Sequence, residues 1–241
     1  RYADDTQLLS RMSLPEVDIY CPIISDCVSS IHQWCASRRL QLNTDKSELI
    51  WFASATNLEH LHDYKSSIQF DGVELQSSET VRDLGVILDN KLNMRAHISK
   101  TVSTCFFHLR RLRQIRRVLS KPLRQRLVSV FILSRIDYCN VLYAGLPSSS
   151  LAPLQRVIHA AARFVANIGP RDHITEVMKQ LHWLPIQQRI TYKLCTLMHA
   201  SVNNIAPDYI TNILLPVIEV SGRSQLRSAG NGLFVVPRTR T

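Results

Sequence analysis

The sequence predicts an α+β fold in which a partial antiparallel sheet is followed by a mainly α-helical region. Three observations indicate this class. The dipeptide Asp71-Gly72 stands between two short apolar segments, as is typical of a two-residue β-hairpin. Beyond Met94, apolar residues recur every three or four positions, which is the spacing of one helix face. A hydrophobic content of 45% with 7 glycines and 10 prolines fits a globular, helix-rich chain.

The segment before the hairpin alternates between strand-like and helix-like patterns. Apolar residues at helical spacing after Pro22 call for an amphipathic helix that packs on a sheet, and the cations Arg38 and Arg39 suit its C-terminus. The expected elements, in order, are a returning strand at Thr6 to Leu9, a helix from about Pro22 to Arg39, a connector at 40–46, a central strand at Ser47 to Phe52 and a polar loop at 53–66.

The hairpin and the segment after it complete the expected sheet. Residues 68–70 and 73–75 are the two predicted hairpin strands. Residues 80–89 are expected to form one further strand, in which Gly85 marks a place where the backbone can approach a ligand closely.

The remainder of the chain predicts successive helices. The first starts near Met94, and Lys121-Pro122 opens the second because proline is favoured in a first turn. A third starts at Ser149 or Ser150 and ends by Gly169-Pro170. Shorter or later helices are expected at 174–181, after Pro185 and after Pro207, before a polar, basic tail. The expected core residues are Ile98, Val102, Cys105, Leu109, Leu112 and Leu119, then Leu123, Leu127, Val130, Phe131 and Ile136, then Leu151, Leu154, Ile158, Ala161, Ala162 and Val165, and finally Ile186, Ile190, Leu194 and Met198.

Charge is distributed unevenly along the chain, whose net charge is +10. Residues 1–90 contain 14 acidic and 7 basic residues, whereas residues 91–136 contain 12 basic residues and no acidic one. This asymmetry is expected when one part of a protein holds metal ions and the next contacts a phosphate backbone. The alternative is an ordinary solvated helix face, although such a face usually mixes both signs. The candidate backbone-binding residues are Lys100, Arg110, Arg113, Arg117, Lys121 and Arg124.

Two adjacent carboxylates, Asp4 and Asp5, follow Tyr2 and Ala3 near the start of the chain. Magnesium prefers oxygen ligands from carboxylates and phosphates. Two such ions can stabilise the attacking and leaving oxygens of a phosphodiester displacement. Asp4 and Asp5 are therefore the candidate catalytic metal ligands. An ordinary solvated turn or a helix N-cap is the alternative interpretation.

Other chemistries are not favoured by the sequence. The six cysteines form no Cys-x-x-Cys pair and are expected to be reduced, mostly buried thiols of an intracellular protein. No His-x-x-x-His pair, dinucleotide fingerprint or phosphate-binding loop is present. His97 and His108 are expected at the surface or on phosphates, and Trp51 and Trp183 in the core. No signal peptide is visible, and no apolar run approaches the roughly 20 residues that span a bilayer.

The chain resembles the C-terminal half of the reverse transcriptase of a non-LTR retrotransposon, of the LINE type and the chicken-repeat-1 and Jockey-like kind. The tetrapeptide Tyr2-Ala3-Asp4-Asp5 is the widely shared part of this resemblance. The more specific motifs are LGVILD at 84–89, SRIDYCN at 134–140, LHWLPIQQRI at 181–190, LRS at 226–228 and VPR at 236–238. The resemblance therefore covers nearly all of the chain.

The resemblance implies a division into four parts and a set of roles. The parts are the end of a polymerase palm at 1–91, a helical thumb-like region at 92–170, a C-terminal helical region at 171–219 and a basic flexible tail at 220–241. It implies RNA-directed DNA synthesis with deoxynucleoside triphosphates on an RNA template and a DNA primer, in the nucleus or cytoplasm and without a membrane. Asp4 and Asp5 would hold two Mg²⁺ ions, while Tyr2, Lys46 and Gly85 would lie at the nucleotide and primer. For Lys46, an ordinary surface lysine before a strand is the alternative.

One part of the family's metal site is not in this chain. In the family, the third metal-binding aspartate lies on an earlier strand, before the position of Arg1. The isolated chain is therefore expected not to polymerise. Two further hypotheses remain. One is a non-catalytic nucleic-acid-binding module, either a remnant or a reused thumb. The other is a helical protein-interaction domain that has no role with nucleic acid.

Overall fold

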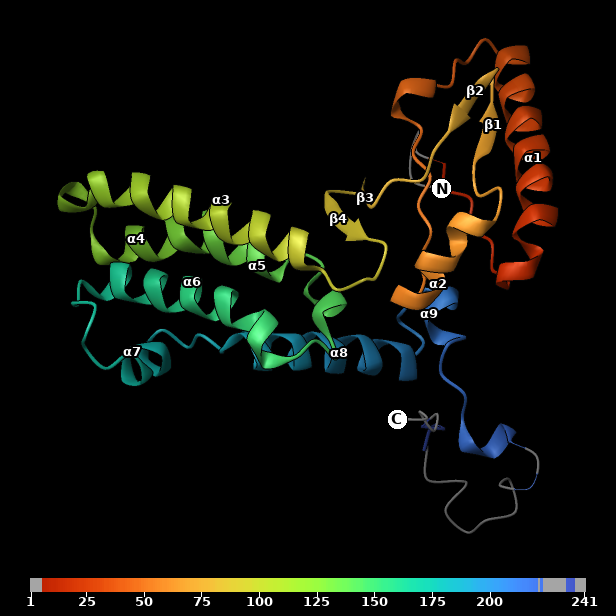
Figure 1. Cartoon of the computed structure of the whole chain (residues 1–241). Helices are drawn as coiled ribbons and strands as arrows, with labels where there is room; N and C mark the ends of the chain where they lie inside the picture. Colours follow the sequence, from red (N-terminus) through yellow and green to blue (C-terminus); the bar gives the residue numbers. More distant parts are fainter. Residues whose placement is uncertain (1–5, 221, 223–232, 237–241) are drawn as a thin grey trace. The chain divides into compact units, whose positions relative to one another are not determined.

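The computed structural model describes residues 6–220, 222 and 233–236, and it is mostly helical with two small antiparallel sheets (Figure 1). The predicted α+β class is confirmed. The chain divides into two compact units, residues 1–104 and 105–241, and the boundary lies inside helix α3. The helices are α1 Val17–Ser37, α2 Ala55–His60, α3 Arg95–Gln114, α4 Lys121–Val128, α5 Ser134–Asp137, α6 Ser148–Ala166, α7 Thr175–Gln180, α8 Ile186–Val202 and α9 Asp208–Thr211. The strands are β1 Ile68–Phe70, β2 Val73–Leu75, β3 Thr80–Asp83 and β4 Val86–Asp89. The expected division into four parts stays a prediction.

Helix α1 begins five residues before the expected start at Pro22. Its entry is fixed upstream, where the Ser13 backbone amide and hydroxyl both donate to the Glu16 carboxylate, at 2.7 and 2.6 Å. These hydrogen bonds, chiefly the one from the hydroxyl, lower the pKa of Glu16. Pro15 precedes the helix in a short 3₁₀ turn, so Pro22 lies inside α1 rather than at its start. The predicted C-terminus is confirmed, since α1 ends at Ser37.

The hairpin predicted at Asp71-Gly72 is confirmed, with β1 and β2 antiparallel. Both turn residues have positive φ, 50° and 77°, as a two-residue hairpin turn requires. The single strand predicted over 80–89 is wrong, because β3 and β4 form a second hairpin there. Its turn residues Leu84 and Gly85 also have positive φ, 44° and 86°, so Gly85 reverses the chain instead of lying within a strand.

Three other predictions in unit 1 are wrong. Thr6 to Leu9 form no strand, and Ser47 to Phe52 contribute only an isolated parallel bridge between Leu49 and Ser77. A strand requires a neighbour that accepts its backbone hydrogen bonds, and within the described residues neither segment has a full partner. The expected loop at 53–66 instead contains α2, which Ser54 caps by accepting a hydrogen bond from the Asn57 amide at 3.3 Å.

The core of unit 1 is small. Val17, Cys21 and Leu61 are buried together, and Trp51 packs against them while its indole nitrogen donates to the Ser66 carbonyl at 3.0 Å. Helix α1 also packs on β1. Polar contacts hold it there, since the Ser25 hydroxyl accepts from the Gln69 amide at 3.1 Å.

Helix α6 is the centre of unit 2 and packs against α4, α7 and α8 (Figure 1). All six of its residues predicted to face inward are buried, which confirms that prediction. The small residues Ala161 and Ala162 are fully buried and allow close helix approach. Its buried residues are Leu151, Leu154, Val157, Ile158, Ala161, Ala162, Phe164 and Val165.

The helix predicted to follow Pro122 is present, but its buried face differs from the expected one. After α4, the chain makes a π-helical segment, Ser129–Leu133, before α5. The expected core residues Leu123, Val130 and Phe131 are exposed, whereas Val128, Ile132 and Leu133 are buried together with the correctly predicted Ile136. A wider π turn keeps residues spaced four apart on one side, so the face no longer follows the α-helical period.

The later helices follow the prediction in position and differ in burial. Helices α7, α8 and α9 lie where they were expected, with Pro185 and Pro207 just before α8 and α9. Trp183 is buried, as predicted. Along α8, Ile186 and Ile190 are buried, whereas Leu194 and Met198 are exposed, so the second half of the predicted core face is wrong. Most of the expected tail, residues 220–241, lies outside the described residues.

Candidate nucleic-acid interface

The candidate metal ligands Asp4 and Asp5, with Tyr2 beside them, lie outside the described residues. Their metal-binding role therefore stays a prediction from the sequence motif. Among the residues that are described, no group of three or more His, Cys, Asp or Glu side chains could hold a metal ion. The magnesium hypothesis thus stays with the sequence motif that contains Asp4 and Asp5.

Lys46 and Gly85, the other candidate residues at the nucleotide, both belong to unit 1. Lys46 is exposed at the end of a 3₁₀ turn, Thr44–Lys46, and its amide donates to the Asn43 carbonyl at 3.2 Å. Gly85 forms the β3–β4 turn beside the exposed Leu84. Both positions are accessible, and the roles of Lys46 and Gly85 stay predictions.

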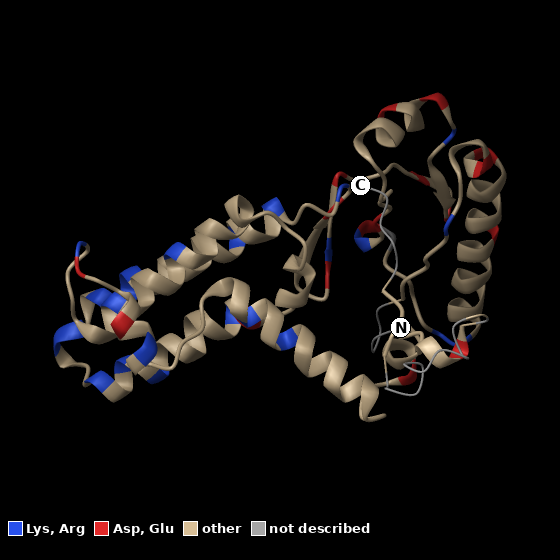
Figure 2. Cartoon of the chain, turned by 90° about the horizontal axis from the view of Figure 1, so that it is seen from below, with Lys and Arg blue, Asp and Glu red and all other residues tan. Residues whose placement is uncertain are grey.

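A cluster of cations surrounds the place where α3 ends and α4 begins (Figure 2). We call this surface the cationic end. It combines the last turns of α3, the 3₁₀ turn Arg116–Val118 and the start of α4, so that a short connection brings two basic helix ends together. Each of its members is exposed. They are Arg110, Arg111, Arg113, Arg116, Arg117, Lys121 and Arg126.

The electrostatics of the cationic end are unbalanced. The sequence has no acidic residue between Asp89 and Asp137. In the part of the chain that the structure describes, the salt bridges lie elsewhere and none includes a member of this surface. Like charges held close together repel one another and destabilise the compact state. Binding of phosphate groups would relieve that repulsion.

Two of the predicted backbone-binding residues stand apart from this surface. Arg124 is half-buried and its Nη1 donates to the Phe164 carbonyl at 3.4 Å, near the end of α6. It therefore connects α4 to α6 as well as carrying charge. Lys100 is exposed on the part of α3 that belongs to unit 1. The remaining four, Arg110, Arg113, Arg117 and Lys121, are members of the cationic end.

The two histidines of the basic stretch do not supply positive charge. His97 is buried, which corrects the expectation of a surface residue, and its Nδ1 accepts a hydrogen bond from the Ile87 amide at 3.3 Å. Burial lowers its pKa. His108 is half-buried, and burial together with the nearby Arg135 and Arg111 lowers its pKa as well. Both rings are therefore neutral near pH 7.

Two exposed aromatic residues next to these cations were missed at the level of sequence. Phe107 on α3 is 45% exposed, and Phe131 in the π-helical segment is 38% exposed. The sequence prediction placed Phe131 in the core because it follows the helical spacing of its neighbours. The usable signal was the combination of aromatic residues and arginines at 106–111.

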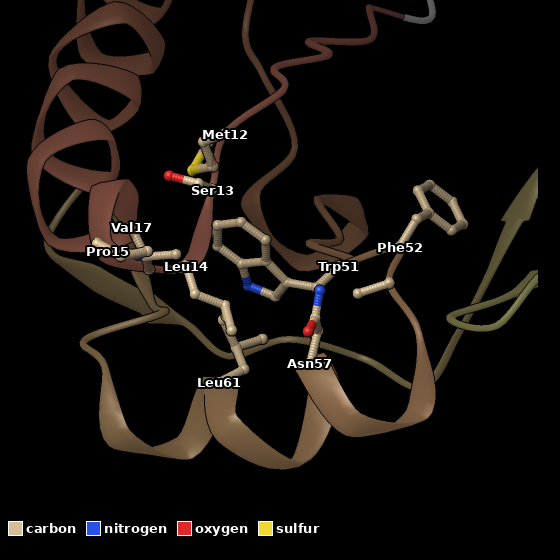
Figure 3. A pocket seen from close by; sticks show the side chains of 10 residues that line it. Met12, Ser13, Leu14, Pro15, Val17, Trp51, Phe52, Asn57 and Leu61 are labelled. Atoms are coloured by element: carbon tan, nitrogen blue, oxygen red, sulfur yellow. The ribbon is translucent and has the colours of Figure 1, made fainter. Parts of the chain in front are cut away.

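The remaining candidates for chemistry are weak. A pocket in unit 1 is lined mainly by apolar side chains around Trp51, Phe52 and Leu14 (Figure 3).

The six cysteines are all free, but only three are buried, so the expectation of mostly buried thiols is wrong for Cys27, Cys139 and Cys195. Burial raises the pKa of the Cys105 thiol to about 11, which makes it a poor nucleophile.

Comparison with known proteins adds no identity. No family model, no curated protein and no solved structure matches the chain. None of the helices in the described part of the chain has both the length and the hydrophobicity of a membrane-spanning segment.

Proposed function

We propose that the chain is part of an RNA-directed DNA polymerase like those of non-LTR retrotransposons, and that its helical unit holds the phosphate backbone of the template–primer duplex. The observation that carries this proposal is the cationic end, which consists of exposed arginines and a lysine without an acidic neighbour in the sequence. Lysines and arginines so placed contact phosphates without reading base sequence. A polymerase needs such contacts because it must hold any sequence it copies.

The catalytic part of the proposal depends on the motif resemblance. Asp4 and Asp5 would hold two Mg²⁺ ions, which stabilise the charge that develops on the oxygens of the reacting phosphate when nucleotides are joined. Lys46 would contact the incoming triphosphate, and Tyr2 and Gly85 would lie beside the primer. Nucleotidyl transfer is thus proposed for the complete polymerase of which these residues would form part.

The alternative proposal is a nucleic-acid-binding module without catalysis. It uses the same cationic end and does not require Asp4 or Asp5. The two proposals therefore agree on binding and differ on Asp4. A protein-interaction domain differs from both, since it would bind an acidic protein surface in place of nucleic acid.

The binding proposal is tested by measuring the affinity for an RNA–DNA hybrid duplex over a range of salt concentrations. The triple variant Arg113→Gln/Arg116→Gln/Arg117→Gln is expected to bind roughly tenfold more weakly or worse, and the slope of log affinity against log salt should fall by about 2 to 3 in magnitude. The matched control is Arg38→Gln/Arg39→Gln/Lys65→Gln, which removes three exposed charges from unit 1. An equal loss in both triple variants, or affinity independent of salt, would contradict the proposal.

The catalytic proposal is tested separately by primer extension with the full-length gene product. Magnesium-dependent synthesis that Asp4→Ala abolishes supports the polymerase. Salt-dependent binding with no Asp4-dependent synthesis supports the non-catalytic module instead.

A further inference from the structure

Three aromatic rings form a continuous surface beside the cationic end. The Phe107 and His108 rings lie edge to face with centroids 5.5 Å apart, and the His108 and Phe131 rings stack with centroids 5.4 Å apart and 24° between their planes. The Arg111 guanidinium lies 5.7 Å from the Phe107 ring centroid. We call Phe107, His108 and Phe131, with Arg111 and Arg135, the stacking surface.

The backbone conformation explains why Phe107 and Phe131 are exposed. In the π-helical segment, Ile132 and Leu133 face the core, and Phe131 is directed away from it. On α3, Cys105 and Leu109 are fully buried, so Phe107 between them lies on the other side of the helix. Both phenylalanines leave a large part of their apolar surface accessible, at 45% and 38% exposure, and π-helical turns are frequent at functional sites.

The charges at the edges of the rings limit what can bind there. Arg111 and Arg135 are both exposed, and both act electrostatically on His108, which places a cation near the ring that joins the two phenylalanines. The ring itself is neutral, so it offers a flat aromatic face and no charge. A flat apolar face flanked by guanidinium groups matches a nucleobase joined to a phosphate. An acidic peptide would use the guanidinium groups and leave the rings uncovered.

We propose that the stacking surface binds unpaired nucleotides of a single-stranded RNA or DNA segment, whose bases stack on Phe107 and Phe131 while Arg111 and Arg135 contact the adjoining phosphates. Stacking on aromatic rings is tolerant of sequence because every base has a π face. This inference rests on the proposed nucleic-acid function and adds a substrate class to it. In this proposal the cationic end binds the duplex, and the stacking surface binds the single strand that extends from the duplex.

The test compares a blunt RNA–DNA hybrid with the same hybrid carrying a single-stranded RNA extension. The unmodified chain is expected to bind the extended hybrid more tightly than the blunt one. The variant Phe107→Ala/Phe131→Ala should lose that gain, a change of roughly tenfold, and bind the blunt hybrid as before. The matched control is Phe52→Ala, a similarly exposed phenylalanine in unit 1 at 40% exposure, which should retain the gain.

A second readout separates stacking from a change in structure. A 2-aminopurine base in the extension should lose fluorescence when it stacks on the protein, and the double alanine variant should abolish that loss. The variant Phe107→Tyr/Phe131→Tyr keeps both rings and should restore the fluorescence change and the affinity gain. A fluorescence change that requires a ring at both positions is expected if the rings contact the base.

The outcomes distinguish this inference from the function it rests on. Three results would show that the stacking surface is not a nucleotide site. The extension could give no gain in affinity, or the alanine variant could bind both hybrids more weakly to the same extent. A polyglutamate peptide could also compete with the extended hybrid in a way that depends on the phenylalanines. Blunt-hybrid binding that depends on the cationic end would still stand in each of those cases. Failure of the unmodified chain to bind either hybrid would overturn both proposals together.

Discussion

Helices α1 and α6 have similar lengths and very different surroundings. Helix α1 buries three of its 21 residues, whereas α6 buries eight of 19. Three helices pack around α6, but α1 packs on a two-stranded sheet and a small cluster, and its Ile19, Ile23 and Trp34 remain about half exposed. Both sequences carry the apolar spacing of a buried helix. The comparison teaches that the spacing orients a helix, while the number of neighbours decides how much of its face is buried.

The two units therefore differ in the interactions that stabilise them. In unit 2, α6 buries eight residues and packs against three other helices. Unit 1 has short strands, a small core and several hydrogen bonds between backbone and side-chain groups, such as the one that the Lys65 backbone amide donates to the Asp18 carboxylate at 2.9 Å. A unit with a large core can carry a concentrated positive charge on its surface, since burial of apolar area offsets the repulsion.

The largest expected effect tests the cores directly. Leu154→Ala, at a fully buried site on α6, should lower the free energy of unfolding by about 3 kcal/mol, because it leaves a cavity among packed helices. Ile23→Ala, at a site on α1 that is 55% exposed, should lower it by less than about 0.5 kcal/mol. Urea unfolding followed by circular dichroism measures both. Equal losses of free energy of unfolding in the two variants would contradict the conclusion that α6 is more deeply packed than α1.

An intermediate effect is expected at Asp89, the polar anchor of unit 1. Its buried carboxylate accepts hydrogen bonds from the amides of Lys91, Asn93 and Met94, at 3.2, 3.0 and 2.7 Å, and so shapes the turn from β4 into α3. Asp89→Ala should lower the free energy of unfolding by about 2–3 kcal/mol, because it leaves these donors without their acceptor.

Asp89→Asn is the matched control, since its amide oxygen retains one acceptor. It should therefore cost less than the alanine variant in the same urea titration. If the two variants were equally stable, the hydrogen bonds of Asp89 would not be what stabilises this turn.

The smallest effect expected is a change of stability with pH through His97. Burial lowers its pKa in the folded state, so below about pH 6.5, its ordinary value, the unfolded chain binds a proton that the folded chain does not. The contribution of neutral His97 to the free energy of unfolding is therefore fully present above that pH, and it is lost as the pH is lowered. His97→Asn removes the titrating ring and keeps an acceptor near the Nδ1 position, so it should reduce the slope of melting temperature against pH between 6.5 and 5.

His62→Asn serves as the control for this measurement, because His62 is exposed on a 3₁₀ turn of the same unit. It should leave the slope unchanged. An unchanged slope in His97→Asn would show that the acid sensitivity of the protein arises elsewhere, for example at His108 or His159, whose pKa values burial also lowers.

The parts of the fold that follow local rules could be predicted from the sequence. The turn at Asp71-Gly72, the helices after Pro122 and Pro185 and the inward face of α6 depend on neighbouring residues and simple spacing. The β3–β4 turn could not be predicted in the same way, because Leu84 at positive φ is rare and stands in an apolar run. Ser47 to Phe52 have the composition of a strand, but strand formation depends on partners that composition does not specify.

The candidate interface was predictable in its charge and not in its aromatic part. Arginines in an acid-free stretch are expected at the surface, and the structure places them there. Phe131 was assigned to the core because an uninterrupted α-helix would direct it inward, and Arg124 was assigned to the surface although it faces α6. The error at Phe131 arises from the change of helical register after Val128, which no local sequence signal indicates, whereas Arg124 lies before that change and its orientation follows from the packing of α4 on α6.

That change of register has a consequence for comparing this chain with others. A hydrogen bond from residue i to i+5 encloses one residue more than the ordinary helical bond. An alignment with a protein whose helix is regular at this point therefore needs a one-residue gap between Ser129 and Leu133. Without it, every position downstream to Asp137 would be matched to the wrong side of its counterpart.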